Sequence, residues 1–207
     1  GRDIHAAVRD RMALPVGEPH DRVTLTNPSS ALTDPTLLIR TTNLSASWAA
    51  EVDTTDGTKG RVFKADGTEL ASDWIAVDAA NEDWIVAVLW SGTLASTDTQ
   101  QVYIYPPLAS RTSYAVGDTY GRHAAYASDV EGYWPLGGGE DRTGKNLDLT
   151  ANGGVTVGGD SGPLGPATDY DGSNDVCDAS APVSLQTPPL TLECLYNETG
   201  SGGHLVN

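Results

Sequence analysis

Residues 132–176 read GYWPLGGGEDRTGKNLDLTANGGVTVGGDSGPLGPATDYDGSNDV, and this stretch decides which fold the sequence predicts. It opens with an aromatic and apolar run, Tyr133–Leu136, which predicts the start of a strand. A glycine-rich turn containing Asp141 follows, then a short apolar piece, and the stretch closes on Asp169–Gly172. Because it consists mostly of turns, it has too few apolar side chains to offset the entropy lost on ordering. We therefore expect it to be the entry into a β-sandwich to which the rest of the chain contributes.

Five short motifs follow one another in this stretch. They are Tyr133–Leu136, Asp141–Gly144, Asn152–Val155, Gly162–Gly165 and Tyr170–Asp175. In this order they resemble the start of laminin-G-like domains, of the concanavalin A-like lectin and glucanase group. The next apolar run, Leu190–Tyr196, is similar to the family's following core strand. The resemblance implies a lectin-like sandwich, and a complete domain would need more residues than follow Tyr133. We therefore expect this sandwich to be incomplete at Asn207.

The preceding half of the chain, residues 23–105, also resembles a known module. It is similar to an uncharacterised β-sandwich domain that often precedes laminin-G-like domains in surface and secreted proteins. The matching features are Arg61–Leu70, Asp73–Ile75, Trp84–Val88 and Val102–Tyr105. The family usually ends on Tyr-Tyr-Gly-Asn, and the sequence departs from it by placing two prolines after Tyr105. The resemblance implies a first sandwich upstream of the lectin-like one.

Short apolar runs separated by Gly, Pro, Asn and Asp predict an all-β chain, because such turn residues interrupt strands at regular intervals. Strands are expected at residues 23–26, 36–39, 47–52, 60–64, 73–77, 84–90 and 101–105, with an Asp-Gly hairpin turn at 65–68. The predicted organisation is a helical arm at 1–15 and a first jelly-roll-like sandwich at 16–107. A connector at 108–129, either a short helix or an extended spacer, then leads to the truncated second sandwich at 130–207.

The run Trp84–Trp90 is apolar on both faces of the strand it predicts. A strand of this kind is either central and covered on both sides, or it lies at an interface. The chain's tryptophans raise a similar choice, because a tryptophan in a strand can belong to the core or stack on a sugar.

The N-terminal arm is predicted to be a short amphipathic helix over residues 3–14. Ile4, Val8 and Met12 are spaced four apart and form one apolar stripe. Twelve residues are marginal as an isolated helix, so the stripe must pack on something. It either docks on its own domain or grips a neighbouring subunit, and we expect the latter in a homo-oligomeric assembly.

Composition excludes several classes of partner. The 207 residues carry a net charge of -16, whereas nucleic-acid binding needs a basic patch. The longest apolar run, Trp84–Trp90, is far shorter than the roughly 20 residues that span a bilayer. We expect neither nucleic-acid binding nor membrane insertion, and an acidic composition suits an extracellular or virion-surface location.

Two kinds of site in the second sandwich follow from its turns and aromatic residues. Trp134 and Tyr170 are the candidate glycan contacts, and both rings are expected beneath a sheet rather than in solvent. No cofactor is certain, but a Ca²⁺ ion is the one that oxygen-rich turns would hold. The alternative is that these carboxylates cap their own turns. The candidate ligands are Asp141, Asp169, Asp171 and Asp175.

The cysteines Cys177 and Cys194 are either two buried thiols or a disulfide, and spacing alone does not supply the geometry of a bridge.

The sequence predicts no catalytic residue. The family's hydrolases carry a Glu-x-Asp-x-x-Glu strand that this sequence does not contain, and no histidine stands beside a Ser or Cys motif. We therefore expect a non-enzymatic surface or virion protein, of the tail or fibre kind, whose lectin-like module recognises host-surface glycans. The alternatives are a purely structural assembly or decoration protein and, third, a polysaccharide hydrolase.

Overall fold

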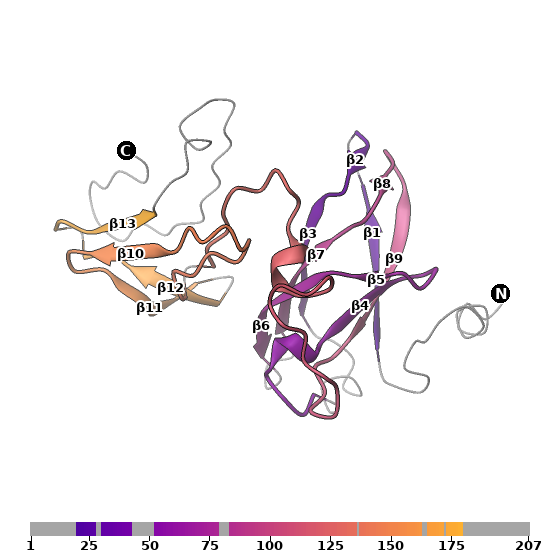
Figure 1. Cartoon of the computed structure of the whole chain (residues 1–207), viewed down its shortest axis with the longest axis horizontal. Helices are drawn as coiled ribbons and strands as arrows, with labels where there is room; N and C mark the ends of the chain where they lie inside the picture. The colour runs from indigo at the N-terminus through magenta and orange to yellow at the C-terminus, as the bar shows by residue number, and fades with distance from the viewer. Residues whose placement is uncertain are drawn as a thin grey trace. The chain divides into compact units, whose positions relative to one another are not determined.

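The structure is a computed structural model that describes residues 20–179 apart from 28–29, 43–51, 79–82, 136, 163–164 and 172. Within those residues the chain is built from strands joined in antiparallel pairs (Figure 1). The helical segments among them are single turns of 3-10 helix, η1 (Gly57–Lys59) and η2 (Arg122–Ala125). The predicted all-β class is therefore confirmed.

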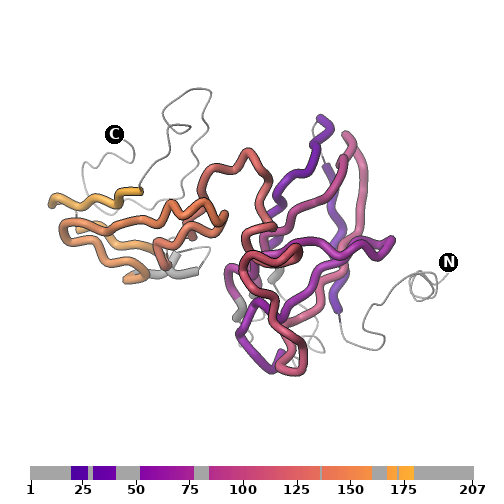
Figure 2. Tube along the Cα trace, viewed as in Figure 1, coloured from indigo at the N-terminus to yellow at the C-terminus, as the bar shows by residue number. Residues whose placement is uncertain are grey.

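The described chain divides into two compact units. Unit 1 takes in residues 20–130 and 142–144, and unit 2 takes in residues 131–141 and 145–179. In Figure 2 the strands of unit 1 are the indigo-to-magenta part of the trace and those of unit 2 the orange-to-yellow part.

Unit 1 contains two larger sheets and one short strand pair. The four-stranded sheet has the order β1 (Asp21–Thr26), β9 (Thr99–Tyr105), β4 (Arg61–Lys64), β5 (Glu69–Leu70). The three-stranded sheet has the order β3 (Thr36–Thr42), β7 (Asp83–Leu89), β6 (Ser72–Asp78). The short pair joins β2 (Leu32–Thr33) to β8 (Thr93–Leu94). Six of the seven predicted strands are found here, and most of the seventh, residues 47–52, lies outside the described residues.

Side chains from both sheets form one hydrophobic cluster. Period-two alternation directs every second residue of each strand to one face, so the inward-facing residues of the two sheets meet. The three described tryptophans of unit 1 belong to this cluster, so of the two roles considered for them the structure shows the core role. The buried members are Ile39, Val62, Leu70, Trp74, Trp84, Val86, Val88, Trp90, Leu94, Val102 and Ile104.

Strand β7 is central in its sheet and buried on both faces. Trp84, Val86 and Val88 face the cluster, while Ile85 and Ala87, on the opposite face, are also almost fully buried. The 3-10 turn η2 packs on β6 and β7. The apolar pattern on both faces of this strand therefore reflects a central, covered strand, the first of the two readings.

The connector contains one short helical turn, η2, so the first of its two predicted forms, a short helix, applies to four of its residues. Apart from η2, residues 108–129 form turns and irregular backbone. The hydroxyl of Thr36 in β3 donates to the carbonyl of Ala125 at 3.3 Å and accepts from the amide of Ala127 at 2.7 Å. These bonds fasten the connector to the three-stranded sheet.

The predicted hairpin turn at 65–68 is confirmed. Strands β4 and β5 flank it, and Gly67 has a φ of 94°, a conformation that favours glycine. The carboxylate of Asp66 accepts a hydrogen bond from the amide of Thr68 at 2.9 Å.

Unit 2 contains two strand pairs within the described residues: β10 (Leu149–Asn152) with β13 (Val176–Ala179), and β11 (Thr156–Gly162) with β12 (Gly165–Asp169). The prediction of a strand that starts at Tyr133 is wrong, because residues 133–135 are irregular and Leu136 lies outside the described residues. Two features explain the difference. The amide of Tyr133 donates to the carboxylate of Asp141 rather than to a strand, and Pro135 has no N–H to donate.

The predicted arm with its stripe of Ile4, Val8 and Met12 lies outside the described residues, and so does Cys194. Cys177 is half-buried in β13, and its disulfide stays a prediction. In the described part of the chain, no helix is long and apolar enough to cross a membrane.

Candidate functional site

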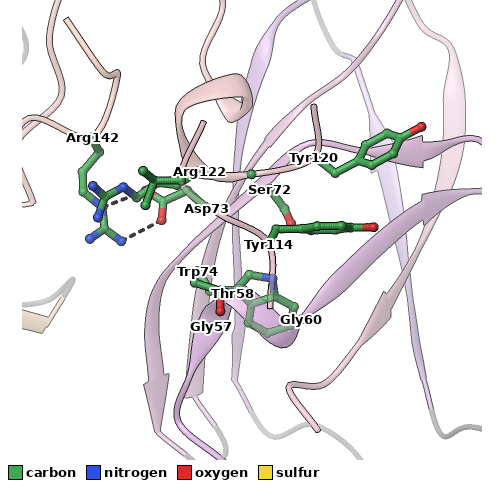
Figure 3. A pocket seen from close by; sticks show the side chains of 12 residues that line it. Gly57, Thr58, Gly60, Ser72, Asp73, Trp74, Tyr114, Tyr120, Arg122 and Arg142 are labelled. Atoms are coloured by element: carbon green, nitrogen blue, oxygen red, sulfur yellow. Dashed lines mark hydrogen bonds and ion pairs between the residues drawn. The ribbon is translucent and has the colours of Figure 1, made fainter. Parts of the chain in front are cut away.

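A pocket of about 160 Å³ opens on unit 1 (Figure 3). Its wall is formed by η1, the start of β6, the loop before η2 and one arginine from residues 142–144. In Figure 3, Arg142 and Asp73 face each other at one side, and the rings of Tyr114 and Tyr120 lie at the other. The lining residues are Gly57, Thr58, Gly60, Ser72, Asp73, Trp74, Tyr114, Val116, Tyr120, Gly121, Arg122 and Arg142.

The back wall depends on two glycines that pack against an indole. A Cβ on Gly57 would lie 2.5 Å from the Cβ of Trp74, and a Cβ on Gly60 would overlap the Trp74 ring. Only glycine permits so close an approach. Asp56 caps the turn between them, because its carboxylate accepts from the Thr58 amide at 3.1 Å and hydroxyl at 2.6 Å. The hydroxyl bond is the main reason that the pKa of Asp56 is lowered.

The charged side of the pocket is a buried ion pair. Asp73 is 2% exposed, and its two carboxylate oxygens accept from Nε and Nη2 of Arg142 at 2.9 and 2.6 Å. The hydroxyl of Tyr126 donates to the same carboxylate at 2.6 Å. A two-point contact of this kind fixes the plane of the guanidinium. Arg142 is therefore a positioned group rather than a mobile surface arginine.

The aromatic side of the pocket is held by a second polar network. The guanidinium of Arg61 lies 3.8 Å from the centre of the Tyr114 ring, and the Tyr114 hydroxyl donates to Glu69 at 3.0 Å. Burial raises the pKa of Glu69 and also that of Tyr114, whose hydrogen bond to Glu69 raises it further. Tyr114 therefore keeps its phenolic proton at neutral pH. The Tyr120 ring, 5.9 Å from the Tyr114 ring and 37% exposed, extends this aromatic side.

The loop that carries the two tyrosines is held by a hydrogen bond to η1 and by one within the loop. The amide of Tyr114 donates to the carbonyl of Thr58 at 3.1 Å, and the amide of Ala115 donates to the carboxylate of Asp118 at 2.7 Å. At Gly121 a Cβ would overlap the carbonyl of Ala115. The loop is thus shaped before any ligand arrives, as expected of a largely preformed site.

The described lining of this pocket combines one carboxylate with guanidinium groups, hydroxyl groups and aromatic rings. Among the described residues that line it, Asp73 is the only carboxylate, and Arg142 and Tyr126 engage it. Glycoside hydrolysis generally uses two carboxylates, one of them as an acid. Two aromatic rings, hydroxyl groups and two guanidinium groups instead make a surface that stacks on a ring and bonds to polar substituents.

Of the four predicted calcium ligands, the carboxylates of Asp171 and Asp175 both lie beside Gly154, whereas Asp141 is engaged in a turn of its own. Asp141 is 3% exposed and accepts from the amides of Tyr133, Lys145 and Leu147 at 3.3, 3.1 and 3.3 Å. It therefore caps a turn, the alternative considered for these residues.

Asp171 accepts from the amide of Ser173 at 2.8 Å and Asp175 from that of Gly154 at 2.6 Å, while Asp169 is exposed at the end of β12. Within the described residues, no three His, Cys, Asp or Glu side chains are grouped to hold a metal. The calcium site stays a prediction.

The two predicted glycan contacts differ in their surroundings. Trp134 is half-buried, its indole N–H donates to the carbonyl of Leu147 at 2.7 Å, and Gly132 packs against its ring. Tyr170 is 46% exposed, so the expectation that its ring lies beneath a sheet is wrong. It follows β12 directly, where the strand pair ends and leaves the ring uncovered. Its exposure is compatible with a role in stacking.

The sequence did not reveal the pocket of unit 1. Its members span residues 57–142, and no spacing links η1 to the loop at 114–121 or to Arg142. The one local signal is the concentration of tyrosine and glycine at residues 114–121, within the predicted connector.

No protein-family model matches this chain, and neither does any curated protein or solved structure.

Proposed function

We propose that this chain is a non-enzymatic surface or virion protein, of the tail or fibre kind, that recognises glycans on a host surface. The observation that carries the proposal is the pocket of unit 1, where two tyrosine rings stand opposite the Asp73–Arg142 pair. A sugar ring has an apolar face of C–H groups and a rim of hydroxyls. Aromatic faces suit the former, and fixed polar groups suit the latter.

The finer architecture belongs to the same proposal. We take the two sheets of unit 1 as the layers of a jelly-roll-like sandwich, supported by their shared hydrophobic cluster. Unit 2 would be the start of the laminin-G-like module, and its exposed Tyr170 is the alternative place for a glycan if the pocket of unit 1 does not bind one. An extracellular or virion-surface location follows from this function.

A purely structural role is the second candidate, and one observation favours it. Leu38 on β3 and Leu32 on β2 are 48% and 38% exposed. Such apolar side chains could contact neighbouring subunits of a homo-oligomeric assembly.

A glycan array, probed with and without Ca²⁺, tests the proposal. We compare the unchanged chain with Tyr120→Ala and Tyr170→Ala, a matched pair because both tyrosines are partly exposed. If the pocket binds sugar, Tyr120→Ala weakens binding about tenfold and Tyr170→Ala leaves it unchanged.

Other outcomes count against the proposal or relocate its site. The reverse pattern, with loss only in Tyr170→Ala, would place recognition in unit 2 and overturn the role of the pocket. An array blank under both conditions would overturn glycan recognition and favour the structural role. Release of reducing sugar from a capsular polysaccharide would overturn the non-enzymatic assignment.

A further inference from the structure

We propose that Asn152 is a site of spontaneous covalent modification, where its side-chain amide is lost through a cyclic intermediate and the chain acquires aspartate or isoaspartate. The proposal is independent of the function proposed above. It follows from the glycine after Asn152, from the exposure of both residues and from the contact of the Asn152 amide with Asp178 on the paired strand.

The reaction needs only the chain itself and water. The amide nitrogen of Gly153 loses its proton and bonds to Cγ of Asn152, while the bond from Cγ to Nδ2 breaks. Nδ2 takes up a proton from water and leaves as ammonia, so a succinimide ring remains. Water then opens this ring. Cleavage of the bond from the ring nitrogen to Cγ gives aspartate, and cleavage of its bond to the main-chain carbonyl carbon gives isoaspartate.

The sequence favours this attack at one place. Asn152–Gly153 is the one Asn-Gly pair among the 207 residues. Glycine has no side chain to shield its nitrogen, and its backbone is the least restricted of any residue. The fold also requires glycine here, since Gly153 has a φ of 76° and a Cβ on it would lie 2.3 Å from the carbonyl oxygen of Asn174. The turn after β10 therefore demands the residue that makes Asn152 reactive.

The other described asparagines lack this combination of exposure and neighbour. Asn152 and Gly153 are both exposed where β10 ends, so water reaches them. Asn27 is 3% exposed, its amide donates to three backbone carbonyls, and the proline after it has no N–H. Asn146 and Asn174 are exposed, but the side chains of the Leu and Asp that follow them shield the attacking nitrogen.

The folded chain slows the reaction, because the side chain and the main chain of Asn152 are both held. Its Nδ2 donates to Oδ2 of Asp178 at 3.0 Å and to the carbonyl of Thr150 at 3.4 Å. These residues are exposed near the end of a pair of strands, where water replaces such bonds whenever the end frays. Local opening of this end therefore sets the rate of modification.

The product alters the contact between β10 and β13, which lie side by side in Figure 1. Thr150 pairs with Asp178 and Asn152 with Val176, so Asn152 and Asp178 are diagonal neighbours on one face of the pair. A carboxylate at position 152 no longer donates to Asp178 and faces it with a like charge, which destabilises a cross-strand pair. Isoaspartate also lengthens the main chain and disturbs the alternation of the strand. Modification should therefore loosen this end of unit 2.

Incubation of the full chain at mildly alkaline pH, followed by peptide mapping, tests the proposal. A protease that cleaves before aspartate releases residues 148–159, in which Asn152 is the one asparagine. Isoaspartate increases the mass of this peptide by about 1 Da, whereas aspartate adds a cleavage before position 152. We expect both products here before any change at Asn27, Asn146 or Asn174. Asn152→Gln should stay unmodified, because its longer side chain would have to close a less favourable six-membered ring.

Hydrogen exchange followed by NMR measures the effect of the product on the fold. Asn152→Asp reproduces the aspartate product, and Asn146→Asp is the control with the same change from amide to carboxylate. We expect the amides of β10 and β13 to exchange faster by a factor of about two to five in Asn152→Asp and to be unchanged in the control. Far-UV circular dichroism confirms that each variant is folded.

Each contrary result has its own meaning. Residues 148–159 that stay unmodified throughout the incubation would overturn the site. Equal modification at all the described asparagines would show that exposure and the following residue do not select Asn152, and would overturn it as well. Equal hydrogen exchange in the two aspartate variants would overturn the role of the contact with Asp178.

Discussion

The two units are stabilised by different kinds of contact in their described residues. Unit 1 has a cluster of buried apolar side chains drawn from two sheets. In unit 2, Leu147 is the buried apolar side chain among the described residues, and the carboxylate of Asp141 beside it organises three backbone amides. Apolar burial is non-directional, whereas a buried carboxylate acts only on the donors that it reaches. The fold of unit 1 should therefore be sensitive to lost volume, and that of unit 2 to lost hydrogen bonds.

The largest effect is expected from Trp84→Ala. Trp84 is 1% exposed in the centre of the cluster, so its loss removes apolar contacts and leaves a cavity. We expect the free energy of unfolding to fall by about 3–5 kcal/mol. Urea unfolding measures this change in free energy. Far-UV circular dichroism is the suitable probe, because removing Trp84 would itself alter the tryptophan fluorescence signal.

A matched apolar change in unit 2 sharpens the comparison. Val176 is 45% exposed in β13, and Val176→Ala should alter stability by no more than about 0.5 kcal/mol. An equal loss from both substitutions would show that unit 2 has an apolar core of the same importance. The contrast drawn between the two units would then be wrong.

The second effect is expected from Asp141→Ala. The substitution leaves the amides of Tyr133, Lys145 and Leu147 without this acceptor in a buried turn, at a cost of about 1–3 kcal/mol or more. Hydrogen exchange followed by NMR should show faster exchange at these three amides.

Asp171→Ala is the control for that prediction. Asp171 also accepts from a backbone amide, that of Ser173, but it is exposed. Water can replace an exposed acceptor, so we expect a change of at most about 0.5 kcal/mol. If Asp141→Ala were as mild, the buried carboxylate would not organise unit 2.

The same contrast explains what could be predicted from the sequence. In unit 1, the short apolar runs predicted the six strands that the structure describes. The apolar faces of Trp84–Trp90 limited that strand to a central or an interface position, and the structure shows the central one. These patterns are local, so the sequence carries them. In unit 2, Tyr133–Pro135 looked like a strand, although the amide of Tyr133 bonds to Asp141 eight residues later. A side chain that accepts a hydrogen bond from a distant backbone amide produces no periodic pattern of apolar residues, so the sequence does not indicate it.

The candidate site was not predictable for a related reason. Asp73 could be assigned to a strand, but its partners Tyr126 and Arg142 come from segments 53 and 69 residues away. Arginines and tyrosines in loops carry no periodic signal of the pocket that they line. Only the tertiary structure brings the aromatic and charged sides together.

The smallest effect concerns the polar network beside the pocket and depends on pH. Glu69, with a side chain 18% exposed, has a pKa raised above its usual value of 4.5 by burial. The folded chain therefore binds this proton more tightly than the unfolded chain does. Its contribution to stability is complete below pH 4.5 and is lost as the pH rises through the higher pKa of the folded state. Glu69→Gln should remove this loss.

The measurement is the difference in free energy of unfolding between the unchanged chain and Glu69→Gln across this range of pH. Asp56 and Asp66 have lowered pKa values, so each contributes stability that is lost as the pH falls. Both proteins share that dependence, and it cancels in the difference. We expect the unchanged chain to lose stability relative to the variant as the pH rises above 4.5. A difference that stays constant with pH would mean that burial does not govern the protonation of Glu69. The network would then resemble an exposed ion pair rather than a buried support of Tyr114.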